Sequence, residues 1–250
     1  MPENYYQAST RKGLIAEAVV TLTLLENGVL LTGYRSADKK EQFQDDIDIV
    51  GRFDLSDGQG IVDKCLSIKC QEAGAMYGKK GEFGFELYEI RACDGGKDVK
   101  PFYTSSPQKL IAIMQAGTVY LFDMGTLRKY LNELSGDPDN FPKVRGLTEK
   151  LKQALRDSNY RYSDTVSGYV DVADFCEKAS FFKMRHFYVS KDLADAANLL
   201  SQVPLSIDAL RDTAYTVELL RFTKKLTSKR TKGTQGAMLE LLKELTNLYA

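Results

Sequence analysis

The sequence predicts an α/β protein with a mixed sheet core followed by a mostly helical C-terminal region. Three observations carry this prediction: an apolar run at residues 14–25, a strand-like alternation at 61–70, and helical periodicity after Pro142. With 250 residues, of which 43% are hydrophobic and 27% charged, the chain has enough apolar residues to bury a sizeable core. We expect two domains, at residues 1–135 and 136–250.

The first half of the chain alternates between helical and strand-like patterns. Residues 14–25 predict a buried helix that stops at Asn27-Gly28, and residues 83–90 fit either a strand or a helix. In chain order we expect strands at 29–34, 47–52 and 61–70, separated by an acidic loop at 41–46 and a turn at 54–60, then a helix at 107–116, a strand at 118–123 and a helix at 126–134.

The second half is dominated by helical periodicity. The predicted helices are 144–157, 172–182, 191–200, 207–226 and 237–249. Basic residues without one acid lie between positions 221 and 232, next to a flexible stretch at 227–236. They are Arg221, Lys224, Lys225, Lys229, Arg230 and Lys232. This basic loop is either ordinary solvated surface or a segment that contacts nucleic-acid phosphates.

Composition excludes several classes of function. The 34 basic and 34 acidic residues balance, so no overall charge attracts nucleic acid or a membrane. No C-x-x-C pair, apolar leader or run of about 20 apolar residues is present, so we expect a protein of the reducing cytoplasm without membrane contact. His186 is the single histidine and is expected in the core. Neither the P-loop motif G-x-x-x-x-G-K-[ST] nor the dinucleotide-binding motif G-x-G-x-x-G occurs, so no nucleotide cofactor is expected.

Three residues in the first half suggest metal-assisted chemistry. Glu17 is the one charged residue within the buried helix, where a carboxylate needs a cation or a donor. Asp48 begins one strand, and Lys69 lies in the next strand of an expected antiparallel hairpin. Two carboxylates and a lysine that meet in this way suit Mg²⁺-assisted hydrolysis of a phosphodiester.

The motifs around these residues resemble those of the PD-(D/E)xK nuclease superfamily, which includes restriction endonucleases and Holliday junction resolvases. Lys12-Gly13-x-x-Ala16-Glu17 is similar to the helix motif of the family, Asp48-Ile49-Val50-Gly51 to its metal-binding strand, and Ser67-Ile68-Lys69-Cys70-Gln71 to its [DE]-x-K strand. The resemblance covers residues 14–123. It implies a restriction-endonuclease-like core in the order helix, three strands, helix, strand.

The resemblance also implies roles for individual residues. Asp48 would be the principal metal ligand, Glu17 a direct or water-mediated ligand, and Lys69 the group that orients the attacking water. Gln71 is a further candidate catalytic residue on the same strand face, with solvated surface as the alternative. Ser67 departs from the family, because it stands where an acid is expected and a hydroxyl carries no negative charge. Glu82 or Glu86 would replace that acid if residues 83–90 are helical, and Glu86 is therefore a candidate metal ligand.

The resemblance therefore implies a Mg²⁺-dependent endodeoxyribonuclease that cuts double-stranded DNA, above all a type II restriction endonuclease. Palindromic sites favour a homodimer. The alternatives are a structure-specific junction or repair nuclease, an inactive nuclease-fold protein that only binds DNA, and a helical interaction protein in which the motif matches are accidental. The basic residues at 224–232, including Lys224, Lys225, Lys229, Arg230 and Lys232, are the candidate DNA contacts.

Overall fold

The computed structural model describes residues 5–56, 58, 60–71, 81–93, 96–101, 109–135, 164–179, 184–203 and 205–228. They form two compact units. Unit 1 contains the described residues of Met1–Cys70, Ala112–Tyr120 and His186–Ala250, and unit 2 those of Gln71–Ile111 and Leu121–Arg185. This grouping differs from the predicted boundary at 135/136, because the last helices of the chain return to pack on the first one.

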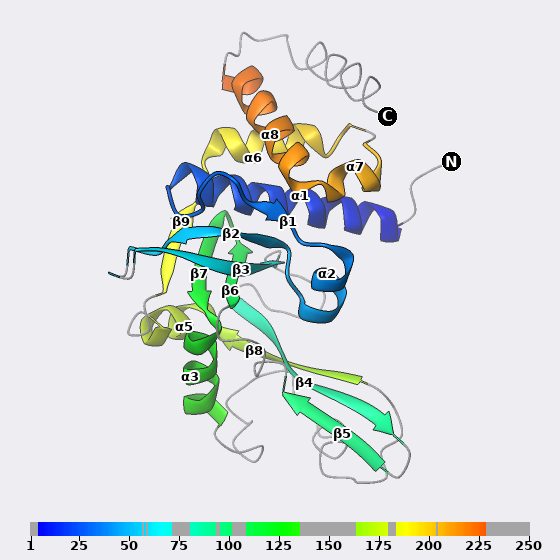
Figure 1. Cartoon of the computed structure of the whole chain (residues 1–250), viewed down its shortest axis with the longest axis vertical. Helices are drawn as coiled ribbons and strands as arrows, with labels where there is room; N and C mark the ends of the chain where they lie inside the picture. The colour runs from blue at the N-terminus through cyan, green and yellow to red at the C-terminus, as the bar shows by residue number, and fades with distance from the viewer. Residues whose placement is uncertain are drawn as a thin grey trace. The chain divides into compact units, whose positions relative to one another are not determined.

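Unit 1 is centred on helix α1 (Tyr5–Glu26), which contains the predicted buried helix and begins nine residues earlier. Its apolar residues, among them Val19 and Leu22, pack with Leu199 and Leu220 in one buried cluster. Figure 1 shows α1 beside α6 (Lys191–Leu200), α7 (Ile207–Arg211) and α8 (Thr213–Ser228). Since these helices cover much of its surface, α1 is apolar on almost every side. Gly28, with φ of +69°, ends it as predicted.

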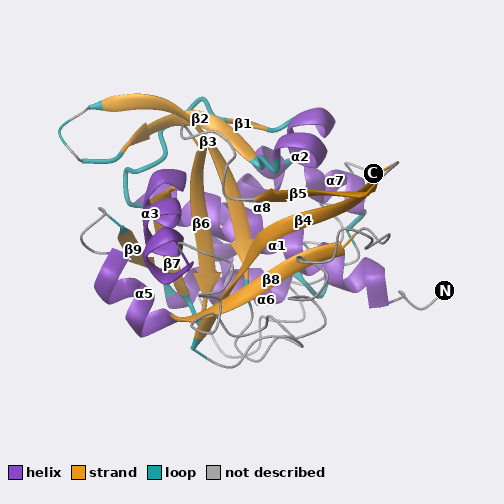
Figure 2. Cartoon of the chain, turned by 90° about the horizontal axis from the view of Figure 1, so that it is seen from below, coloured by secondary structure: helices purple, strands orange, loops and turns teal. Residues whose placement is uncertain are grey.

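A six-stranded sheet packs against helices α1 and α8 (Figure 2). Its strand order is β1-β2-β3-β6-β7-β9. The strands are β1 (Arg35–Ser36), β2 (Ile49–Asp54), β3 (Ile61–Cys70), β6 (Lys109–Gln115), β7 (Thr118–Asp123) and β9 (Arg185–Tyr188). β2 and β3 pair antiparallel, with Ile49 opposite Leu66, which confirms the predicted hairpin. α1 packs against β3 and α8 against β1.

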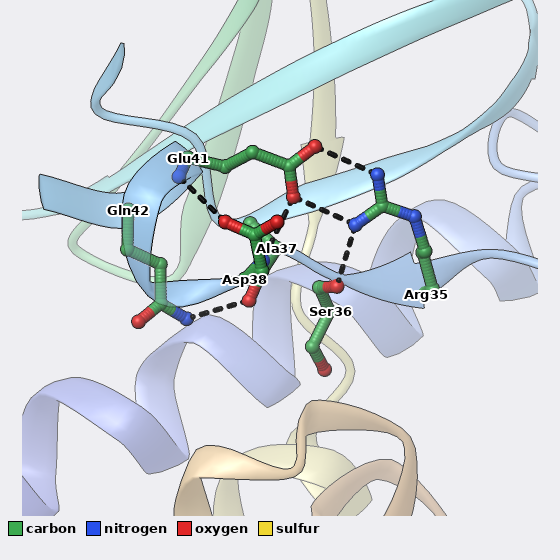
Figure 3. Close-up of polar contacts among 6 residues, drawn as sticks. All are labelled: Arg35, Ser36, Ala37, Asp38, Glu41 and Gln42. Atoms are coloured by element: carbon green, nitrogen blue, oxygen red, sulfur yellow. Dashed lines mark hydrogen bonds and ion pairs between the residues drawn. The ribbon is translucent and has the colours of Figure 1, made fainter. Parts of the chain in front are cut away.

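The segment before β2 differs from prediction. Residues 29–34 form only an isolated bridge from Leu30 to Phe53, and the predicted acidic loop contains helix α2 (Lys39–Asp45). Asp38 caps α2: its side chain accepts from the backbone N–H of Glu41, and the Glu41 carboxylate accepts from the backbone N–H of Asp38. Figure 3 shows this reciprocal capping box and the paired bonds from Arg35 to Glu41. Asp38-x-x-Glu41 is the sequence pattern of such a box.

The predicted helix at 107–116 is wrong, because residues 109–115 form strand β6. This strand is buried along almost its whole length, so its apolar residues follow no period that separates strand from helix. Ala116 and Gly117 follow with φ of +49° and +77°, and two such residues form the tight turn that joins antiparallel strands. The described core therefore does not have the expected order of helix, three strands, helix, strand.

Unit 2 contains a three-stranded antiparallel sheet, β5-β4-β8. Residues 83–90, for which the sequence allowed either a strand or a helix, form part of strand β4. Phe175 contacts Phe83, Phe122 and Tyr130 edge to face and forms the centre of the core. The elements of this unit are β4 (Glu82–Cys93), β5 (Gly96–Pro101), α3 (Met124–Ser135), β8 (Asp164–Asp171) and α5 (Val172–Ala179).

Several other predictions are settled by the described residues. The helix at 191–200 and the strand at 118–123 are confirmed, whereas 207–226 is divided at Asp212 into α7 and α8. His186 is exposed on β9, where its ring contacts Tyr188, so its predicted core position is wrong. No described helix is long and apolar enough to cross a membrane. The predicted helices at 144–157 and 237–249 lie outside the described residues.

Candidate functional site

Asp48 is held in place by the backbone on both sides of β2. Its N–H donates to the carbonyl of Leu66 at 2.8 Å, and its own carbonyl accepts from the N–H of Ala37 at 2.9 Å. Its side-chain Oδ2 accepts from the N–H of Ile68 at 2.6 Å. The carboxylate is therefore fixed against the end of β3 that carries Ser67 and Lys69.

Glu17 reaches the same place from α1. Burial and, to a smaller extent, the nearby Asp48 charge raise the pKa of its carboxyl from 4.5 to about 8, and the Lys69 charge opposes the rise. Both charges act on Glu17 because both groups lie near it. The structure thus brings together the three predicted residues, Glu17, Asp48 and Lys69, from segments that are far apart in the sequence.

A fourth residue, Asp46, was not among the predicted site residues. Its Oδ1 accepts from Lys69 Nζ at 2.5 Å, and its Oδ2 accepts from Ser67 Oγ at 3.0 Å. Asp46 is the C-cap of α2 in the left-handed conformation, with φ of 52°. The sequence carries one signal for it: an aspartate directly after a short capped helix, where Asn and Asp adopt this conformation more readily than other residues.

Two predicted residues, Gln71 and Glu86, are not part of unit 1. Gln71 belongs to unit 2, where its amide Nε2 donates to the carbonyl of Gly84 at 2.7 Å and its Oε1 accepts from the N–H of Gly84 at 2.9 Å. Glu86 lies in strand β4 of the same unit, opposite Ser167. The argument for Glu82 or Glu86 as the replacement acid required a helix at 83–90, so its premise is wrong.

The basic segment also differs in part from prediction. Lys224 and Lys225 are in helix α8 rather than in a flexible loop. Lys224 Nζ donates to both carboxylate oxygens of Glu26, at 2.6 and 2.8 Å, so an acid from α1 neutralises this lysine although the segment itself contains no acid. Lys229, Arg230 and Lys232 lie outside the described residues.

The donor set at Glu17 and Asp48 suits a hard divalent cation. Mg²⁺ is commonly bound by one or two carboxylates while it keeps several waters. The Asp48 charge contributes to the raised pKa of Glu17, so the two carboxylates lie near each other. Within the described part of the chain, no three His, Cys, Asp or Glu residues are grouped so as to hold a metal. Two neighbouring carboxylates are a donor set that Mg²⁺ accepts when water or substrate supplies its other ligands.

Comparisons with models of protein families, with curated proteins and with solved structures found no match.

Proposed function

We propose that this protein is a Mg²⁺-dependent endonuclease that hydrolyses phosphodiester bonds of double-stranded DNA, acting as a homodimer of the restriction-endonuclease type. One observation carries the proposal: the partly buried Glu17 carboxyl lies within the electrostatic reach of both Asp48 and Lys69. A buried acid next to a second acid is costly for a fold, and such pairs gather where chemistry requires them.

Each residue has a task that follows from its surroundings. Asp48, fixed by the Ile68 N–H, and Glu17 would hold Mg²⁺, which when bound neutralises phosphate charge and lowers the pKa of water. The Lys69 ammonium, about two-fifths exposed, reaches solvent and donates to the oxygens on which negative charge develops. Glu17, when ionised, draws the cation toward the buried side of the site.

Cleavage of a supercoiled plasmid tests the proposal. We expect the pure protein to cut with Mg²⁺ and to stop when EDTA is added, and discrete bands would support sequence-specific restriction. Lys69→Met should abolish cutting, since it keeps an apolar stem of similar length and removes the ammonium. Asp63→Asn is the matched control, because Asp63 is an exposed carboxylate on the same strand. Equal cutting by Lys69→Met would contradict the assignment.

A second candidate function is DNA binding without cleavage. Ser67 supports this second candidate, because it stands where the PD-(D/E)xK family has an acid. In addition, the described residues contain no group of three carboxylates that could hold a metal. A gel shift without cleavage under any divalent cation would support this reading. Preferential cutting of four-way junctions over linear duplex would instead favour a structure-specific nuclease.

A further inference from the structure

We propose that Asp46 is a positioning residue for Lys69: its carboxylate, at the end of α2 and bonded to Ser67, holds the Lys69 ammonium in place. The inference rests on the proposed function for the task of Lys69. Its geometry rests on two hydrogen bonds: Lys69 Nζ donates to Oδ1 of Asp46, and Ser67 Oγ donates to Oδ2. Ser67 and Lys69 are two residues apart on β3 and share one face of the strand. One carboxylate therefore holds both.

The two bonds have different effects. A lysine side chain has a flexible four-carbon stem and loses much conformational entropy when its ammonium is confined. Only a strong bond to the ammonium offsets this loss. The bond to Asp46 joins two charged groups and is of the stronger class. Ser67 is buried, with 1% of its surface exposed, and its hydroxyl fixes the second oxygen of the same carboxylate. Ser67 thereby sets the direction in which Asp46 presents its charge to Lys69.

The backbone around Asp46 is fixed as firmly as its side chain. The N–H groups of Asp46 and Ile47 both donate to the carbonyl of Glu41 and close the end of α2. Glu41 also takes part in the capping box and accepts two bonds from Arg35, each of 2.7 Å (Figure 3). The left-handed conformation at position 46 admits Asp or Asn at low cost and disfavours most other residues.

Asp46 acts through Lys69 rather than as a metal ligand. In the part of the chain that the structure describes, Glu17, Asp48 and Asp46 form no three-carboxylate cluster that could hold a metal. Its carboxylate oxygens are instead directed to Ser67 and Lys69.

Moving the acid along the chain tests the inference. Asp46→Asn keeps the left-handed backbone and should lower kcat about 10- to 100-fold with little change in KM, the size of effect seen for residues that orient a functional group. Ser67→Asp alone should also lower kcat, because it places a second carboxylate beside Asp46. The double variant Asp46→Asn, Ser67→Asp carries one carboxylate again, two residues from Lys69, and should recover most of the activity. Asp63→Asn should change nothing.

A second measurement does not depend on cleavage. The rate at which acetic anhydride acetylates Lys69, measured by mass spectrometry on folded protein, should rise roughly two- to fivefold in Asp46→Asn, as expected from the loss of a half-exposed ion pair. Thermal melting confirms that each variant is folded. Asp63→Asn should leave the Lys69 rate unchanged.

The outcomes separate the two proposals. If wild type cuts DNA and the double variant is no better than Asp46→Asn, the inference is overturned while the proposed function stands. If wild type does not cut, the proposed function fails and acetylation decides: an unchanged Lys69 rate overturns the positioning geometry, and a raised rate supports it.

Discussion

Oδ2 of Asp48 accepts a hydrogen bond from the backbone N–H of Ile68 at 2.6 Å, across the β2–β3 pair. The same carboxylate raises the pKa of Glu17 on α1. Asp48 thus makes a hydrogen bond to the backbone and also acts on the charge of Glu17. Substitutions at this position affect both unless they are chosen to separate them.

Asp48→Asn should abolish cleavage while the fold remains, because the amide oxygen still accepts from Ile68 but the negative charge is gone. Asp48→Ala should abolish cleavage and also cost about 1 to 3 kcal/mol in the free energy of unfolding, since a partly buried N–H loses its partner. Plasmid cleavage and urea unfolding measure the two effects. Equal stability of both variants would show that the Ile68 bond contributes nothing.

Glu17→Gln should stabilise the metal-free protein progressively as the pH rises above about 4.5, with most of the effect present by about pH 8. The folded-state pKa of Glu17, about 8, lies above its usual value of 4.5, so the folded state binds the proton more tightly than the unfolded state. Wild-type stability therefore falls as the pH rises from 4.5 to 8, by an amount on the order of 4 kcal/mol. Gln has no proton to lose, so the variant should show a flatter profile in urea unfolding.

Mg²⁺ provides the control for this prediction. At pH 8 it should raise the melting temperature of wild type more than that of Glu17→Gln, because a cation that binds the ionised carboxylates stabilises the folded state. The same profile of stability against pH in both proteins would contradict the burial of an acid at position 17.

Glu41→Gln should weaken the segment that carries Asp46. The bonds from Arg35 and from the Asp38 backbone lower the pKa of Glu41 to about 2, so its contribution is complete above about 4.5 and disappears as the pH falls through about 2. Gln still fits the capping box, but it removes the charge and one of the two oxygens that accept from Arg35. At pH 7 the loss should be about 0.5 to 1 kcal/mol, and it should shrink towards pH 2.

The matched control is Asp208→Asn, which removes an exposed partner of Arg211 on α7. Urea unfolding at several pH values measures both variants. A loss for Glu41→Gln that does not depend on pH would show that the charge of Glu41 is not what holds α2.

The sequence was informative where a pattern had one structural solution. The alternation at 61–70 and the apolar run at 14–25 gave β3 and α1, and these elements carry Lys69 and Glu17. It failed at 107–116, since a strand buried on both faces has the composition of a buried helix.

Asp46 could not be found by motif, because its role depends on tertiary contacts. It lies 21 residues from Ser67 and 23 from Lys69, and only the pairing of β2 with β3 and the capped end of α2 bring them together. The bond between Lys224 and Glu26, 198 residues apart, was hidden from sequence reasoning for the same reason.

The last prediction separates two parts of the basic segment. Each phosphate contact that is lost should flatten the plot of log affinity against log salt concentration by about 0.9 for duplex DNA. Lys229→Ala with Arg230→Ala should therefore flatten it by about 1.8 and leave sequence preference nearly unchanged, because phosphate contacts position the protein and base contacts specify the sequence.

Lys224→Ala should leave the slope unchanged, since Glu26 already neutralises Lys224 and DNA would have to compete for it. Gel shifts at several salt concentrations measure these slopes. A flatter slope for Lys224→Ala would show that DNA displaces Glu26, and loss of sequence preference in the double variant would show that Arg230 contacts a base edge.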